Sequence, residues 1–237
     1  MIKFFRSIRQ QLLSQNRFSK YMLYAVGEII LVVIGILIAL QINNWNETQK
    51  TIHWERRFLT DLLNEVKTDY EQLSEVYKKQ SDKRAASLKV LELIENNSQE
   101  DKGVIDSIYT FSQQGNITFF PTTGVYDSGT AAGKIENIKN DNLKYAIMNL
   151  YNRYYNRLVY NGEVLDGVVG KVDWEQRKYF NNSTGEIKSW EAIQEYEFSG
   201  RLRHLISQNE VYSNIAKRNL ERMREVITLI NQELNIE

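Results

Sequence analysis

The feature that most constrains this chain is an apolar run near its beginning. Residues 21–42 carry a single charged side chain, Glu28, and the stretch Ile29–Leu40 offers no polar face. As a helix the run would be about 33 Å long, enough to cross a hydrocarbon core of about 30 Å. A cleaved signal peptide would have a shorter apolar region and an Ala-x-Ala site, which is missing here. The sequence therefore predicts an uncleaved signal-anchor helix that spans a membrane.

The flanks of this run predict its orientation. Residues 1–20 hold five Lys or Arg and no acid, whereas residues 43–62 mix three Lys or Arg with three acids. The positive-inside rule then places the N-terminus in the cytoplasm. We expect a basic cytoplasmic or interfacial segment over 1–20, with a short amphipathic helix over 2–13, a transmembrane helix over 21–42 and an extracytoplasmic domain over 43–237. In a bacterium this corresponds to a single-pass protein of the inner membrane with a periplasmic domain.

A resemblance supports this division. The block FSKYMLYAVGEIILVVIGILIALQINNWNE, residues 18–47, resembles the N-terminal signature of an uncharacterised family of bacterial single-pass membrane proteins. Residues 122–151 resemble that family more loosely. The resemblance implies a location in the cell envelope and a helical outer domain, and it implies no chemistry.

Small and acidic residues share one face of the predicted span. Gly35 lies seven residues after Glu28 and Ala39 eleven, so both point within about 20° of the direction of Glu28. Gly35-x-x-x-Ala39 lets a second helix approach closely, and a buried glutamate can hydrogen-bond across to it. We interpret Glu28, Gly35 and Ala39 as a membrane-helix interface. A proton or ion relay at Glu28 and a tolerated glutamate beside a chance spacing are the alternatives.

The outer domain has the composition and periodicity of an all-α fold. The whole chain holds one proline and 12 glycines, and none of either lies between Asn44 and Asn96. Apolar residues step in threes and fours along this stretch and again from Leu202 to Leu234. We expect an antiparallel helical bundle whose long first and last helices pack on each other in the manner of a coiled coil. Shorter helices are predicted over 104–113, 141–158 and 189–198, and the turn 181–186 offers a plausible cap before the last of them. The best candidate for a strand is 117–120.

The irregular stretch 115–133 is the first place to expect a ligand or partner. It contains the only proline of the chain and a cluster of side-chain donors, and loops held on rigid helices often bind. The candidate binding residues are Phe119, Phe120, Pro121, Thr122, Thr123, Tyr126 and Asp127. The alternative is a tight reversal between helices in which the aromatic residues enter the core.

Composition and spacing argue against several chemistries. Cysteine is absent, which excludes thiolate metal sites and a cysteine nucleophile. The two histidines, His53 and His204, lack the spacing of a zinc site, and Gly129–Lys134 is one residue too short for a phosphate-binding loop. Residues 43–237 hold 25 basic and 29 acidic residues, so their balance opposes nucleic-acid binding. We expect no cofactor, no metal and no nucleic-acid partner.

These observations predict a protein that binds and assembles and does not catalyse. The leading hypothesis is an inner-membrane protein whose periplasmic bundle mediates self-assembly or serves as an accessory or scaffold subunit of an envelope complex. Its expected partners are membrane lipid and either a second copy of the chain or another envelope protein. The alternative is a ligand-sensing bundle that signals through a partner subunit.

Overall fold

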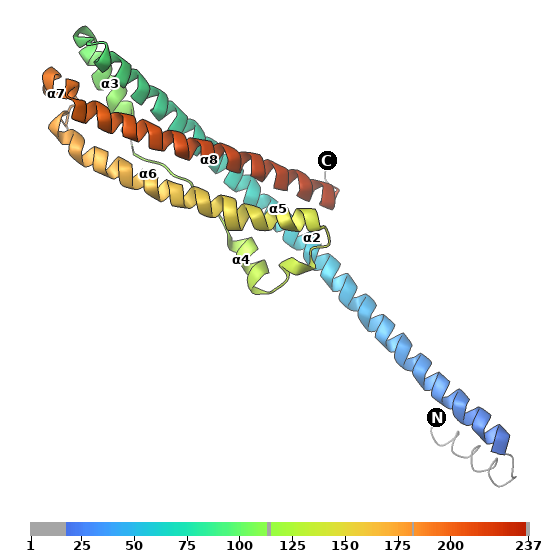
Figure 1. The fold of residues 1–237 in the computed structure, drawn as a ribbon. Coiled ribbons are helices and arrows are strands. Elements are labelled where there is room, and N and C mark those ends of the chain that lie inside the picture. The colour runs from blue at the N-terminus through green and yellow to red at the C-terminus, as the bar shows by residue number, and fades with distance from the viewer. Residues whose placement is uncertain (1–17, 113–114, 182, 236–237) are drawn as a thin grey trace. The chain divides into compact units, whose positions relative to one another are not determined.

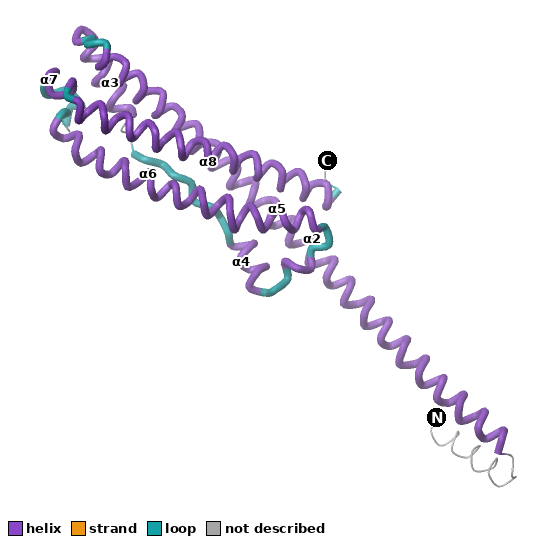
Figure 2. Tube along the Cα trace, in the orientation of Figure 1, coloured by secondary structure: helices purple, strands orange, loops and turns teal. Residues whose placement is uncertain are grey.

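The computed structural model describes residues 18–112, 115–181 and 183–235, and the expected helix over 2–13 lies outside them. The described chain is helical nearly throughout (Figures 1 and 2). Its elements, in order, are α2 (Phe18–Glu95), η1 (Gln99–Asp101), α3 (Lys102–Ser112), α4 (Gly124–Ala131), η2 (Ile135–Asn137), α5 (Asp141–Asn149), η3 (Leu150–Tyr155), α6 (Asn156–Glu175), η4 (Gln176–Lys178), α7 (Trp190–Gln194) and α8 (Tyr196–Leu234).

The all-α prediction is confirmed, because no strand forms within the described ranges. Phe180 and Ile187 make one isolated antiparallel bridge. Residues 117–120, the predicted strand, are a loop. An extended segment needs a neighbouring strand to complete a ladder, and here only helices surround it.

By its internal contacts the chain divides into two units, Met1–Glu55 and Arg56–Glu237. In the first unit α2 is exposed along its apolar residues from Met22 to Ile42. Among the described residues α2 is the one helix long and apolar enough to cross a membrane, judged by length and composition. The prediction of a candidate span is confirmed to that extent.

The second unit begins with the remainder of α2, from Arg56 to Glu95. This part is an unbroken helix, since it contains neither proline nor glycine. It ends at Glu95; Asn97, two residues later, has a left-handed φ of 56°, and Ser98 N–H donates to the Leu93 carbonyl at 3.0 Å. These are the marks of a Schellman C-cap, in which asparagine takes the place usual for glycine.

Helix α8 follows its predicted pattern closely. All nine apolar positions expected to face the core are buried, namely Leu202, Leu205, Ile206, Tyr212, Ile215, Met223, Val226, Ile230 and Leu234. The helix contacts α6 most extensively, and the two lie side by side in Figure 1. Contacts with α2 join Arg84 to Glu210 at 2.8 Å, Gln80 to Asn209 at 2.7 Å, and the Arg224 guanidinium to the Tyr70 ring at 5.4 Å.

Three predicted boundaries differ from the structure. The helix predicted over 141–158 continues to Glu175 through a π-helical segment, Leu150–Tyr155. The helix predicted over 189–198 ends at Gln194 and α8 starts at Tyr196. The cap of α7 is Ser189, which accepts from Ala192 N–H at 3.2 Å. The stretch 115–133 is only partly irregular, since it contains α4.

Candidate functional site: an anchored loop

The loop before α4 is held by side chains of the long helices. Residues 115–123 are extended and have no strand beside them (Figure 2). Their backbone groups are bonded instead by side chains: Gln80 donates to the Ile117 carbonyl at 2.7 Å, Tyr212 Oη accepts from Phe119 N–H at 2.9 Å, and Asp69 accepts from Thr122 N–H at 3.0 and 3.1 Å. The loop therefore has one defined path along α2 and α8.

Two carboxylates one turn apart on α2 fix the end of this loop. Asp69 is 2% exposed, and both of its oxygens face Thr122 N–H. Glu65 accepts from Val125 N–H at 3.0 Å, in the first turn of α4. Since the N-terminus of a helix carries unpaired N–H groups and partial positive charge, Glu65 caps α4 from another helix.

Tyrosines complete the surroundings of these carboxylates. Tyr151 Oη donates to the second oxygen of Glu65 at 2.9 Å, and the Tyr151 ring stacks on Tyr126 with centroids 4.2 Å apart. The Tyr155 phenol lies beside Asp69. The group Glu65, Asp69, Tyr126, Tyr151 and Tyr155 is called the acid–tyrosine cluster below.

The π-helical segment places two of these tyrosines. Tyr151 and Tyr155 lie within Leu150–Tyr155 and are 4% and 1% exposed. The extra residue of a π-turn shifts the buried face by one position. This explains why Tyr155 is buried and Tyr154, expected on the core face from regular α-helical spacing, is only half-buried.

Burial sets the protonation of the cluster. It raises the pKa of Asp69 above its ordinary value of 3.8, although the hydrogen bonds from Thr122 oppose the shift. Burial and, after it, the nearby negative charges raise the pKa values of Tyr151 and Tyr155. Both phenols are therefore protonated at neutral pH; that of Tyr151 donates to Glu65, whereas the buried Tyr155 hydroxyl makes no hydrogen bond to a described residue.

The seven residues predicted to form the binding loop differ in accessibility. Phe119 and Tyr126 are buried, as the core alternative predicted for them. Phe120, by contrast, is 77% exposed, so the prediction that all the aromatic residues enter the core is wrong for this one. Pro121 and Thr123 are half-buried, and Thr122 and Asp127 are exposed. Thr123 Oγ1 donates to the Asp127 carboxylate at 2.7 Å.

The sequence reading missed the acid–tyrosine cluster except for Tyr126. A usable signal exists for Asp69, which falls between Val66 and Leu73 on the apolar stripe of α2. A carboxylate at a core position has to have partners, because burying an unpaired charge is costly. Its backbone partner is the Thr122 N–H of a distant loop, and the spacing of residues along one helix cannot reveal such a partner.

The predicted membrane-helix residues lie in the first unit. Gly35 and Ala39 are exposed and Glu28 is half-exposed. A Cβ added at Gly35 would meet no atom within 4 Å. Helical geometry places the three residues on one face, as predicted from their spacing.

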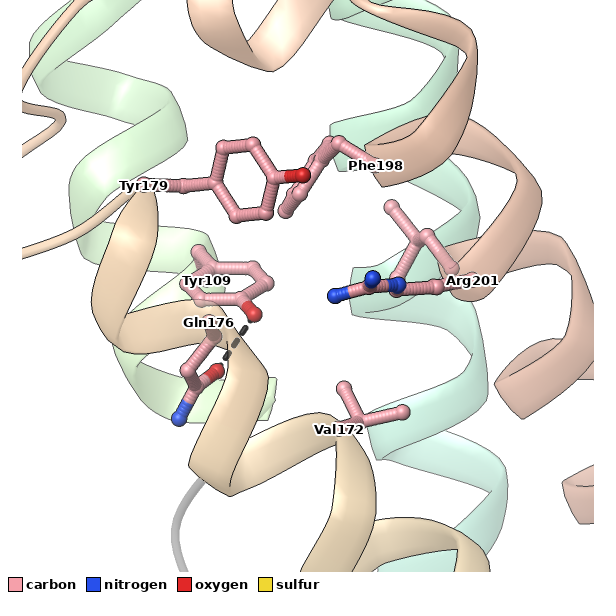
Figure 3. Close-up of a pocket in the computed structure, with 7 residues that line it drawn as sticks. Tyr109, Val172, Gln176, Tyr179, Phe198 and Arg201 are labelled. Atoms are coloured by element: carbon pink, nitrogen blue, oxygen red, sulfur yellow. Dashed lines mark hydrogen bonds between the residues drawn. The ribbon is translucent and has the colours of Figure 1, made fainter.

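A second candidate is an aromatic hollow lined by residues of α3, α6, η4 and α8 and by Tyr179 (Figure 3). It holds about 240 Å³ of space, part of it open to solvent. Tyr109 donates to Gln176 at its base and stacks on Phe180 at 3.9 Å. Arg201 points toward it, and the charge of Arg201 is balanced by Glu175 at 2.7 Å and by Glu197. The hollow suits a small apolar group better than an anion.

The described residues contain no cluster of three or more His, Asp or Glu able to hold a metal ion. His53 and His204 are both exposed.

Comparison with known proteins gives a family match. Residues 28–210 match the protein family described as "Family of unknown function (DUF6090)". No curated protein and no solved structure matches the chain.

Proposed function

Because the chain belongs to this family of unknown function, we propose its role from its own residues: it is a single-pass inner-membrane protein whose periplasmic helical bundle assembles with itself or with another envelope protein. The observation that carries the proposal is the exposed apolar part of α2. Large side chains from Met22 to Ile42 are about half exposed or more. A surface of this extent requires lipid or another protein to cover it.

The proposed orientation rests on charge. Five Lys or Arg and no acid precede the span, whereas acidic residues accompany the Lys and Arg that follow it. We therefore place residues 1–20 in the cytoplasm and residues 43–237 in the periplasm.

The proposed domain is an antiparallel bundle with coiled-coil-like long helices. Partner positions support it, since Tyr70, Gln80 and Glu95 on α2 meet Arg224, Asn209 and Arg203 on α8. The numbers rise along one helix as they fall along the other. Burial at steps of three and four on α8 agrees with such packing.

The proposed contact between copies is the face with Glu28, Gly35 and Ala39. The space beyond Gly35 is open, so a second helix could approach its backbone, and dispersion contacts would then hold the pair. A carboxyl group on the same face adds a hydrogen bond that lipid cannot supply.

The test compares variants of the full-length protein in detergent. Glu28→Leu and Gly35→Leu should both lower the mass of the particle measured by native mass spectrometry. Leu37→Phe is the matched control, because residue 37 lies nine positions after Glu28 and so on the opposite face. An unchanged mass for both Glu28→Leu and Gly35→Leu would exclude this interface. A second protein in fixed ratio would identify the chain as an accessory subunit.

A ligand-sensing role is the second candidate, and Phe120 favours it. Its ring is 77% exposed, whereas the preceding residue, Phe119, is buried and the following residue, Pro121, is half-buried. A presented aromatic side chain on an anchored loop suits recognition. A metabolite library screened for thermal stabilisation of the full-length protein tests this role, and a Phe120→Ala variant should lose any response found. Stabilisation that survives Phe120→Ala would place the ligand elsewhere.

A further inference from the structure

A polar hollow lies where α2, α3, α6 and α8 meet, at the opposite end of the extended loop from the acid–tyrosine cluster. It holds about 350 Å³ of space, part of it open to solvent. Most of its lining is polar and comes from α2 and from the loop, with apolar residues of α6 and α8 closing it. The α2 lining residues are Gln80, Lys83, Arg84 and Ser87.

Two cations face this hollow. Lys83 donates to the Gly115 carbonyl at 2.5 Å, and Arg84 pairs with Glu210 at 2.8 Å through one terminal nitrogen. Burial lowers the pKa of Lys83, which shows that the protein surroundings disfavour its charged form. A negative charge in the hollow would favour that form.

Arg84 and Ser87 bring further hydrogen-bond donors to the lining, and one of these donors is unused among the described residues. Arg84 Nε is buried and has no partner. Ser87 is 4% exposed and lines the hollow, which brings a second donor, its hydroxyl, to the wall. They sit three residues apart on α2 and so on neighbouring positions of one helix face. Buried donors of this kind normally have a partner.

The remaining polar groups of the lining are already engaged. Gln80 donates to Asn116 and to the Ile117 carbonyl, and its own carbonyl accepts from Asn209. Asn116 in turn donates to Asp166. The acceptors of the hollow are thus occupied, and its unused capacity consists of the Arg84 Nε donor beside positive charge.

We propose that this hollow is a binding site for a small anion of the size of chloride, held by Arg84 Nε, the Ser87 hydroxyl and the charge of Lys83. The space between the side chains admits a water-sized sphere, which is on the scale of a monatomic anion. The site goes beyond the proposed assembly role, because an ion there would tighten the junction of four helices with the loop that carries Phe120.

The test is a chloride titration of the full-length protein in detergent, with sodium gluconate at equal ionic strength as the reference salt. Chloride should raise Tm progressively and gluconate should not. Ser87→Ala and Arg84→Lys each remove one donor, and the second keeps the charge. Each should weaken chloride binding about tenfold or more. Lys89→Gln is the control, since Lys89 lies on the same helix, is half exposed and pairs with Glu92 outside the hollow.

Equal responses to chloride and gluconate would overturn the proposal, because they would show charge screening alone. An unchanged chloride response in both Ser87→Ala and Arg84→Lys would also overturn it. If either variant fails to fold, chloride NMR line broadening by the wild-type protein decides: excess broadening that bromide displaces supports the site, and its absence overturns it.

Discussion

Replacing Asp69 tests the acid–tyrosine cluster most directly. Its carboxylate is 2% exposed and receives Thr122 N–H at 3.0 and 3.1 Å. Asp69→Leu keeps comparable bulk and removes the acceptor, which leaves a partly buried N–H without a partner. We expect a loss of about 2 kcal/mol in the free energy of unfolding. For a domain of this size that corresponds to a fall of about 4–8 °C in Tm.

Asp69→Asn separates the hydrogen bond from the charge. The amide oxygen can still accept from Thr122 N–H, and the buried negative charge is gone. We expect the stability of this variant at neutral pH to lie within about 1 kcal/mol of wild type. Circular dichroism melts of full-length wild type, Asp69→Asn and Asp69→Leu in the same detergent provide the measurement.

The pH dependence of wild-type stability shows whether the buried charge of Asp69 stabilises or destabilises the fold. Burial raises the pKa of Asp69 in the fold, whereas in the unfolded chain the group titrates near 3.8. At neutral pH the wild type thus carries the cost of a buried charge. As the pH falls through the raised folded-state pKa toward 3.8, the folded state takes up a proton first, and this cost is relieved. The stability of wild type relative to Asp69→Asn should therefore improve on acidification across that window.

Comparing the two proteins at each pH removes the contribution of the other acids. A difference that stays constant, or that moves in favour of Asp69→Asn as the pH falls, would refute the assignment of a raised pKa. Full stability of Asp69→Leu would refute the anchoring role of the carboxylate.

Two further predictions concern the contacts around the loop. Gly129 brings α4 against α2, and a Cβ there would lie 2.7 Å from Phe58 Cε2. Gly129→Val should therefore lower the free energy of unfolding, measured by calorimetry, by about 1–3 kcal/mol, whereas Gly124→Ala, which has open space around it, should be neutral or slightly stabilising. Equal stabilities of the two variants would contradict the close packing at Gly129. Burial raises the pKa of Tyr212 from 10.0 to about 12. The contribution of Tyr212 to stability should be intact below pH 10.0 and be lost between pH 10.0 and about 12, because the unfolded chain deprotonates first. A Tyr212→Phe variant that shows the same alkaline loss of stability would refute the raised pKa.

The helices were predictable where one face of a regular helix is buried. Every predicted core position of α8 is buried, because buried residues recur mainly at steps of three and four from Phe198 to Leu234, with Asn209 and Asn219 filling the wider gaps between the predicted positions. Helix α2 is less regular. Leu88 is 39% exposed although it resumes the apolar spacing, and Ser87 and Val90 are buried beside it. Where each turn carries only one apolar residue, the apolar spacing does not determine which face of the helix is buried.

The candidate site was predictable only in part. The sequence located the loop from its proline and glycines, but α4 within it carries no strong helical signal in eight residues. The π-turn at Leu150–Tyr155 has no pattern of its own, since it inserts one residue into a helix that looks regular. Asp69 and Glu65 act on backbone N–H groups more than fifty residues away in the chain. Tertiary hydrogen bonds of this kind are not reflected in the spacing of residues along the sequence.

The cost of burying Asp69 indicates what the cluster provides. An apolar residue at position 69 would avoid the desolvation penalty, yet it would leave Thr122 N–H unpaired. Asp69 and Glu65 bond the backbone on either side of Thr123, and Tyr212 bonds it at Phe119. The backbone is therefore fixed both before and after Phe120, so the point from which its exposed ring projects is fixed relative to α2. An aromatic side chain on a fixed backbone loses little conformational entropy on binding. The cluster thus exchanges some stability for a defined position of Phe120, which is what either proposed role requires of a contact surface.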